Sequence, residues 1–196
     1  NKQQYFWLLA SLLEASDKVA NTASVYGAFL KNFKKKALND LDFKLLDYEI
    51  TNQNNEVYQQ NASHLISSIK GDILYLDPPY NHRQYGSNYH VLNRIAENKV
   101  FKSDKKTGII DYEKSLFCNK KLVFDEFEAL IKKADFPYIF ISYNNEGIIN
   151  IDQFKKMLEQ FGEYKLFEKE YKAFKADSKR QNKSEKTFEH LHMLKK

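Results

Sequence analysis

The chain has 196 residues, a length that suits one domain with a hydrophobic core or part of a larger domain. No apolar stretch is as long as a membrane span and no signal peptide is evident, so we expect a cytoplasmic protein without a membrane partner. The single cysteine, Cys118, excludes an internal disulfide and a cysteine-rich metal cluster. A net charge of +5 and 15% aromatic residues are compatible with a polyanionic partner, but proteins of many functions share them.

The first 55 residues are predicted to be mainly helical. Apolar side chains recur at helical spacing over residues 3–20, and the spacing continues over residues 25–33. The basic cluster at residues 34–36 suits a helix end, and a phosphate contact explains it equally well. Residues 43–50 form a possible strand, and the polar residues 51–55 indicate a loop.

The remaining residues, 56–196, are predicted to alternate between strands and helices. The expected strands cover residues 57–60, 72–76 and 138–142, and an antiparallel pair covers residues 163–174 and 187–194. The expected helices cover residues 62–69 with Asn61 as N-cap, 88–98, 121–134, and 151–161 with a capping box from Asn150 and Gln153. Residues 99–120 indicate a long surface loop. This order predicts an α/β sheet that ends in an antiparallel hairpin.

The most informative motif, Asp77-Pro78-Pro79-Tyr80, directly follows the strand predicted at residues 72–76. Two prolines fix φ and remove two amide donors, so the strand must end in a rigid, extended loop. In open α/β sheets, ligands bind just outside the carboxyl ends of the strands. The motif therefore offers a carboxylate, two carbonyl oxygens and an aromatic ring to a flat ligand that bears an amine. The alternative is a structural turn in which the prolines stop the strand and the aspartate caps it.

An adenine in this position could be methylated on its exocyclic amine. That amine is a poor nucleophile because its lone pair is delocalised into the ring. If the Asp77 carboxylate and the Pro78 carbonyl accept its two protons, electron density is localised on the nitrogen, which could then attack an electrophilic methyl group. Stacking on Tyr80 would contribute about 1–3 kcal/mol. A base inside a duplex cannot reach such a pocket, so a DNA substrate would require base flipping.

The four residues resemble the catalytic motif of the amino-group DNA methyltransferases. The longer string over residues 77–90 is similar to the alpha (Dam-like) class of adenine-specific enzymes, which are often found in restriction–modification systems. Further similarity follows in family order at residues 17–27, 106–108, 117–118, 142–147 and 174–177. Some ribosomal RNA guanine methyltransferases share the four-residue core, so an RNA methyltransferase is one alternative. A non-catalytic DNA-binding or assembly part of a split enzyme is another.

The resemblance implies S-adenosylmethionine as methyl donor, duplex DNA as substrate and N6-methyladenine as product. It implies catalytic roles for Asp77, Pro78 and Tyr80, with Pro79 shaping the loop. Asp77 would also contact the donor, as would Asn61, which stands where the family often has an acidic residue facing the donor's adenosine. In fold, the resemblance implies a partial Rossmann-like sheet over residues 56–196, preceded by a helical segment over residues 1–55.

One family motif is absent from these 196 residues. The aromatic–x–Gly–x–Gly turn that binds the donor does not occur, and all six glycines are isolated. We therefore expect the chain to correspond to the C-terminal part of such an enzyme and to bind the donor weakly by itself. An N-terminal half or an upstream segment would then be the partner that carries the donor-binding motif.

Several polar side chains near the motif are candidates for DNA binding. They are Arg83, Tyr85, Asn88 and Tyr89 after the motif, Asn144 and Asn145 after the next strand, and Lys175, Lys179 and Arg180 in a basic segment. Loop-anchoring hydrogen bonds, Asx-turns and a solvated loop are the respective structural alternatives. His190 and His192 alternate on one strand without cysteine partners, and no metal site is expected.

Overall fold

The computed structural model describes residues 1–49, 52–100, 102–103, 105–171 and 187–196. The chain divides into two units, residues 1–56 with 85–113 and residues 57–84 with 114–196. Among the described residues, no helix has the length and apolar character needed to cross a membrane.

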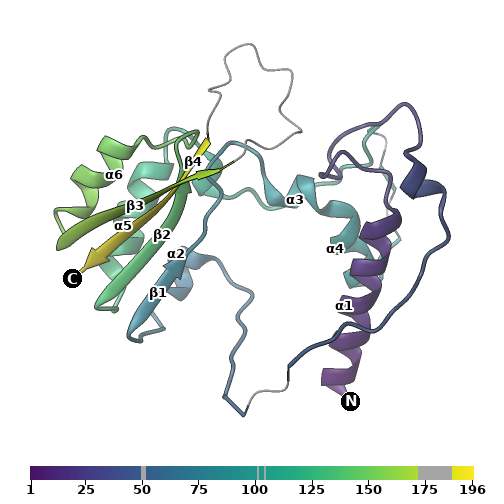
Figure 1. The fold of residues 1–196 in the computed structure, drawn as a ribbon, viewed down its shortest axis with the longest axis horizontal. Helices are drawn as coiled ribbons and strands as arrows, with labels where there is room; N and C mark the ends of the chain where they lie inside the picture. The colour runs from purple at the N-terminus through teal and green to yellow at the C-terminus, as the bar shows by residue number, and fades with distance from the viewer. Residues whose placement is uncertain (50–51, 101, 104, 172–186) are drawn as a thin grey trace. The chain divides into compact units, whose positions relative to one another are not determined.

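The second unit contains a four-stranded mixed sheet. Its strands are β1 (Ile73–Leu76), β2 (Tyr138–Asn144), β3 (Glu163–Tyr171) and β4 (Thr187–Lys195), in the spatial order β1-β2-β4-β3 (Figure 1). β1 pairs with β2 in parallel, and β4 is antiparallel to both β2 and β3. The parallel pair and the closing antiparallel pair confirm the α/β class and the predicted hairpin.

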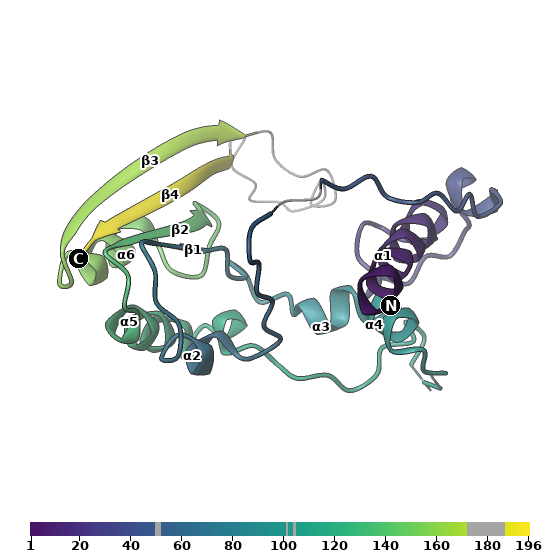
Figure 2. The ribbon, with the colours of Figure 1, turned by 90° about the horizontal axis from the view of Figure 1, so that it is seen from below.

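One face of this sheet is covered by helices. These are α2 (Ala62–Leu65), α5 (Val123–Lys133) and α6 (Ile151–Leu158), and Figure 2 shows α2 and α5 on one side of the sheet. Phe127 of α5 and Phe154 of α6 both make edge contacts with the ring of Tyr143, so α5 and α6 pack on the same face. The core between the helices and the sheet includes Phe127, Leu130, Ile131, Ile139, Ile141, Phe154, Met157, Leu158 and Leu194.

Local sequence explains where these helices begin. Asn150 and Gln153 form the predicted capping box at α6, and the Asn61 side chain accepts a hydrogen bond from the Ser63 amide at α2. α2 is shorter than predicted and ends at Leu65, because the chain must turn before Lys70 forms a bridge with Asp135 and leads into β1. The predicted loop over residues 99–120 also contains a short 3-10 helix, η2 (Leu116–Cys118).

The first unit is built around α1 (Lys2–Val19), which confirms the predicted N-terminal helix. Its predicted continuation over residues 25–33 is wrong. α1 ends at Val19, and Ser24 adopts a positive φ of 73°. The Asn21 side chain then bonds the backbone of Asn32 and Lys34, so these side-chain contacts hold the segment as a loop. The helix that follows is only η1 (Lys35–Leu38).

Two predicted strands do not form. The backbone of Leu46, within the strand expected at residues 43–50, bonds side chains of α1: it accepts from Trp7 Nε1 at 2.7 Å and donates to Ser11 Oγ at 3.0 Å. Ile50, at the end of that prediction, lies outside the described residues. Residues 57–60 have no strand partner among the described residues, and Val57 is 95% exposed. A strand requires a neighbouring strand, and neither segment has one.

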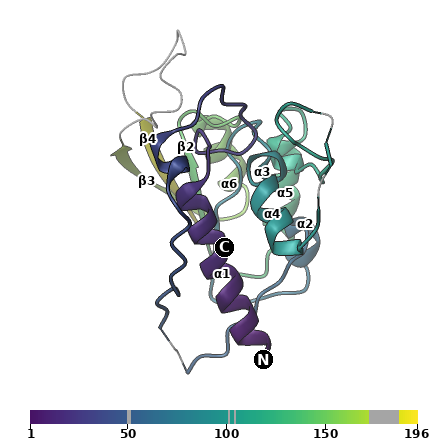
Figure 3. The same ribbon diagram turned by 90° about the vertical axis from the view of Figure 1, so that its right-hand side faces the viewer.

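The helix predicted at residues 88–98 is confirmed, and a short helix that was not predicted comes before it. α3 (Tyr85–Asn88) precedes α4 (His90–Glu97), which ends where Asn98 adopts a left-handed conformation. The Asn88 carbonyl accepts the Tyr26 amide at 2.7 Å, which joins the end of α3 to the loop that follows α1. α1 also packs beside α4 in this unit (Figure 3).

Candidate active site

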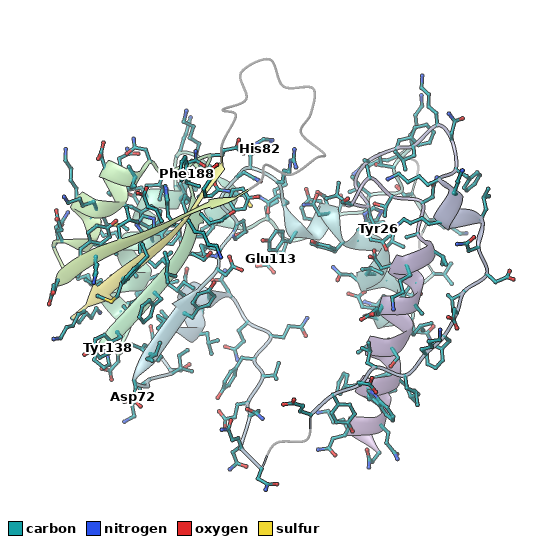
Figure 4. All side chains as sticks on the ribbon, in the orientation of Figure 1. Tyr26, Asp72, His82, Glu113, Tyr138 and Phe188 are labelled. Carbon is teal, nitrogen blue, oxygen red and sulfur yellow. The ribbon has the colours of Figure 1, made fainter. Side chains whose placement is uncertain are left out.

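The predicted catalytic motif lies at the carboxyl end of β1, where the polar end of β2 is also found. β1 and β2 run parallel, with Ile73 paired to Tyr138, so the carboxyl ends of the two strands lie at the same end of the sheet. Figure 4 shows Asp72 and Tyr138 at the opposite end, where the two strands begin. The structure thus brings the end of β2, with Asn144 and Asn145, to the same end of the sheet as the motif.

Tyr80 is fixed through its backbone while its ring stays accessible. The Tyr80 carbonyl accepts a hydrogen bond from the Ile148 amide at 2.9 Å and another from the Tyr143 hydroxyl at 3.3 Å. The two rings meet edge to face, with centroids 6.4 Å apart. Tyr80 remains 37% exposed, so part of its ring is available for stacking.

The surroundings of Tyr80 further favour the protonated form of its phenol. Burial, followed by the negative charges of Glu189 and Glu146, raises its pKa, while the Arg83 charge and a hydrogen bond from the Asn144 side chain oppose the rise. A neutral phenol keeps the ring available as an uncharged stacking surface across the neutral pH range.

Tyr143 supports the site from inside the core. Its side chain is 2% exposed, and burial raises the pKa of its hydroxyl. The ring lies directly over Gly147, where an added Cβ would come within 2.0 Å of Tyr143 Cε1. Gly147 is therefore the residue that lets the Tyr143 ring lie where its hydroxyl reaches the Tyr80 carbonyl.

The two asparagines at the end of β2 have different surroundings. Asn144 is buried; its Oδ1 accepts the Glu146 amide at 3.0 Å in an Asx-turn, and its side chain also bonds the Tyr80 phenol. Asn145 is exposed, and both its amide and its side-chain oxygen bond the backbone of Phe188. Asn144 is thus part of the site, and Asn145 holds the beginning of β4. A role of either residue in DNA binding stays a prediction.

Glu189 is a site residue that the sequence analysis missed. It lies opposite Asn144 in the register of β2 and β4. Burial, followed by the negative charge of Asp77, raises the pKa of its carboxyl. Nothing in the sequence near Glu189 signals this position, because it depends on how two strands more than 40 residues apart are paired.

The loop after the motif is anchored by its backbone. The Arg83 amide donates to Asn81 Oδ1 at 2.9 Å, and its carbonyl accepts from the Cys118 thiol at 3.4 Å. Gln84 bonds the backbone of Ser115 through both its amide nitrogen and its oxygen. These contacts give residues 81–84 a defined path away from the motif.

The remaining predicted site residues belong to the first unit, cap α2 or are not described. Tyr85, Asn88 and Tyr89 belong to the first unit, where the exposed rings of Tyr85 and Tyr89 are 5.9 Å apart. Asn61 Oδ1 is engaged in capping α2 at 2.9 Å from the Ser63 amide. Lys175, Lys179 and Arg180 lie outside the described residues.

The two histidines of β4 are buried on the helix-covered face. Nδ1 of His192 is 2.9 Å from the Tyr164 hydroxyl, and Nε2 of His190 is 3.3 Å from the Glu168 carboxylate. The His192 ring stacks on Phe154. Burial, followed by the charge of His190, lowers the pKa of His192 to about 4, so its imidazole is neutral at physiological pH. Both histidines are thus core residues, and each has a polar partner.

Comparison with known proteins gives one family and several relatives. The family model for the D12 class N6 adenine-specific DNA methyltransferases matches residues 3–157. The type II methyltransferase M.NlaIII of Neisseria lactamica is 54% identical over 198 residues, which cover 100% of this chain and 59% of that protein.

Two further relatives are more distant and longer. M.FokI of Planomicrobium okeanokoites is 39% identical over 92% of this chain and 29% of its own length. M.CviAII of Paramecium bursaria Chlorella virus 1 is 41% identical over 88% of this chain and 52% of its own length. The chain thus spans less than two thirds of each of these curated relatives. No solved structure matches the chain.

Proposed function

Because the chain belongs to the D12 class N6 adenine-specific DNA methyltransferase family, we propose that it carries the base-binding part of an enzyme that methylates N6 of adenine in duplex DNA. We further propose that the enzyme is the modification member of a restriction–modification system and acts in the cytoplasm. The relatives named as type II methyltransferases and modification methylases support this role.

Our proposed mechanism assigns three tasks to the motif at the end of β1. The Asp77 carboxylate accepts one N–H of the flipped adenine's amine, and the Pro78 carbonyl accepts the other, which raises the electron density on N6. Pro79 keeps the loop rigid, and the exposed face of Tyr80 stacks on the purine. The observation that carries the proposal is the fixed backbone of Tyr80, held by Ile148 and Tyr143, beside an exposed Asp77.

The surroundings of the motif suit a cationic methyl donor. S-adenosylmethionine, when bound, supplies an electrophilic methyl group on a positively charged sulfur. Asp77, Glu189 and Glu146 bring three carboxyl groups close enough to the site to influence the titration of Tyr80 or of one another. Asp77 and the exposed Asn61 would contact the donor, although Asn61 Oδ1 already accepts a hydrogen bond from the Ser63 amide.

Donor binding is proposed to need more polypeptide than these 196 residues. The sheet would then be part of a larger Rossmann-like sheet, with residues 56–196 as its catalytic half and residues 1–55 as the end of the region before it. The isolated glycines and the 59% coverage of M.NlaIII support this view. We expect no micromolar binding of S-adenosylmethionine to the 196-residue chain in calorimetry, and such binding would contradict this part of the proposal.

The choice between a DNA and an RNA substrate is tested by product analysis. The full-length polypeptide that carries this chain is incubated with S-adenosylmethionine and either unmethylated genomic DNA or ribosomal RNA. Mass spectrometry of the digested nucleosides is expected to find N6-methyladenine from the DNA alone. Methylated guanine from the RNA would support the RNA alternative, and the absence of any methylated nucleoside would contradict both.

A further inference from the structure

Glu189 of β4 lies at the end of the sheet that carries the motif. It is half-buried and is paired with Asn144, the last residue of β2. Figure 4 shows Phe188, which precedes Glu189 in the chain, at the end of the sheet away from Asp72 and Tyr138. An acidic side chain thus stands beside the motif on a strand that the proposed mechanism does not otherwise use.

The pairing of the strands brings Glu189 close to the carboxylate of the motif. Paired residues project from the same side of a sheet, so the side chains of Asn144 and Glu189 are neighbours. Asn144 bonds the phenol of Tyr80, and Asp77 directly follows β1, which runs parallel to β2. The negative charge of Asp77 in turn acts on the carboxyl of Glu189. The two carboxyl groups therefore form an interacting pair.

Methylation of an exocyclic amine releases a proton that such a pair could take up. The N6 lone pair forms the new N–C bond, and the electron pair of the donor's S–C bond stays on the sulfur, so the positive charge passes from sulfur to N6. An N–H bond of the base then breaks, its electron pair returns to nitrogen, and the proton leaves. Carboxylates that have just lost a neighbouring cation are favourable acceptors for this proton.

Glu189 has the properties of a group that takes up a proton and releases it again. Burial, followed by the charge of Asp77, raises the pKa of its carboxyl above the ordinary value of a glutamate. A group transfers protons most effectively when its pKa is near the working pH, and the rise moves Glu189 in that direction. Because Glu189 is only half-buried, the proton can pass on to solvent.

We propose that Glu189 is a positioning residue for methyl transfer and acts through Asp77: Asp77 takes the proton from N6, and Glu189 takes it from Asp77. This transfer restores the Asp77 carboxylate as an acceptor for the amine of the next adenine. The role rests on the proposed function, because only transfer of a methyl group to an amine produces the proton.

The test is the pH dependence of single-turnover methyl transfer to duplex DNA by the full-length polypeptide. Below its raised pKa, Glu189 already carries a proton and cannot take another, so the rate of the original enzyme should fall as the pH falls. Glu189→Gln should be about tenfold slower at neutral pH and should lack the part of this fall that the titration of Glu189 causes. Glu189→Asp keeps a carboxyl group and should retain most of the rate and the fall.

Other charged groups around Glu189 stay in these variants. Lys169 of β3 is paired with Glu189 across the other strand boundary, and Asp77 faces it from the motif. Glu146 and Arg83 act on the same phenol as Glu189 does. Because all four groups are common to the enzymes compared, the difference between the pH profiles reports Glu189 alone.

A matched control is Glu163→Gln, which removes the same charge at the opposite end of the sheet. Glu163 begins β3, and it projects from the same face as Lys169, the partner of Glu189, because the two residues are an even number of positions apart. This variant should leave the rate and the pH profile unchanged. Gel-shift titrations with the same duplex should give equal DNA affinities for all variants.

A second measurement reports the interaction of the two carboxyl groups without any methyl transfer. Carbon-13 NMR of the side-chain carboxyl of Glu189 gives its titration in the 196-residue chain. Asp77→Asn removes the negative charge that helps to raise the pKa of Glu189, so this pKa should fall in the variant. If Glu189→Gln fails to fold, as judged by its melting temperature, this titration and the profile of Glu189→Asp decide the question.

Three results would overturn the proposed role of Glu189. One is a pH profile of Glu189→Gln that matches the original, and another is a pKa of Glu189 that does not change in Asp77→Asn. The last is a slower Glu189→Gln with weakened DNA affinity and an unchanged profile, which would show a structural role only. An original enzyme that methylates no DNA would instead contradict the proposed function itself.

Discussion

The two faces of the four-stranded sheet differ in what covers them, and the candidate site draws on both. On the helix-covered face, Ile139, Ile141 and Leu194 are fully buried, whereas Ile73 and Tyr75 on the face away from the helices are 63% and 60% exposed. Tyr143 reaches the Tyr80 backbone from the covered face, and Asn144 reaches the phenol from the other. The covered face therefore holds the core of the unit, whereas the other face leaves large apolar side chains exposed.

The largest expected effect is on the free energy of unfolding, which should fall much more when a side chain is truncated on the covered face than on the other face. Phe154 is fully buried and stacks on His192, so Phe154→Ala should lower the free energy of unfolding by about 3–5 kcal/mol. Tyr75→Ala, on the face away from the helices, should change it by only about 0.5 kcal/mol. Urea unfolding followed by circular dichroism measures both. Similar losses for the two variants would contradict the contrast between the faces.

The covered face should also make stability depend on pH. The pKa of His192 falls from 6.5 to about 4 on folding, so below pH 6.5 the unfolded chain binds a proton that the folded chain does not. The contribution of His192 to the free energy of unfolding is therefore constant above pH 6.5. It falls by up to about 3 kcal/mol as the pH drops toward 4. His192→Leu should remove this contribution to the dependence of the free energy of unfolding on pH.

Other titratable residues near His192 remain in the variant, so a control is needed for their effect on the pH dependence. His190, whose own pKa is lowered by burial, its partner Glu168, and Tyr164, whose hydroxyl is 2.9 Å from His192 Nδ1, all stay in the variant. The informative quantity is thus the difference between the unfolding curves of the original chain and of His192→Leu. A difference that does not vary between pH 7 and pH 4.5 would show that His192 is not buried as a neutral imidazole.

A smaller effect should follow from filling the space above Gly147. Gly147→Ala forces the Tyr143 ring to move and should cost about 1–3 kcal/mol. Gly71→Ala is the control, because its Cβ would lie 3.2 Å from the Phe136 ring and needs only a slight shift. Thermal unfolding compares the two variants, and equal melting temperatures would mean that Tyr143 is not held against Gly147.

Sequence reasoning succeeded where the signal was local. The capping box at Asn150, the apolar run before Asp77 and the alternation in the closing strands each depend on neighbouring residues, and the structure confirms all three. The motif at residues 77–80 was found for the same reason, because its chemistry lies in four consecutive residues.

The errors came from contacts between distant residues. The apolar spacing over residues 25–33 suits a helix, but hydrogen bonds from the Asn21 side chain hold that segment as a loop. Residues 43–50 suit a strand, but Leu46 bonds α1 instead. Glu189 was missed because only the register of β2 and β4 brings it opposite Asn144.

The most direct test of the central claim is single-turnover methyl transfer to duplex DNA by the Asp77→Asn variant of the full-length polypeptide. Asparagine keeps the shape of the side chain and an acceptor oxygen, but it replaces the negatively charged carboxylate with a neutral amide, which is a weaker acceptor for the amine N–H. We predict a loss of at least about 100-fold in the rate with DNA affinity unchanged in gel-shift titrations, while Asp72→Asn, at the opposite end of β1, retains full activity. Methyl transfer by Asp77→Asn at the original rate would contradict the assignment of these residues as the base-binding half of the active site.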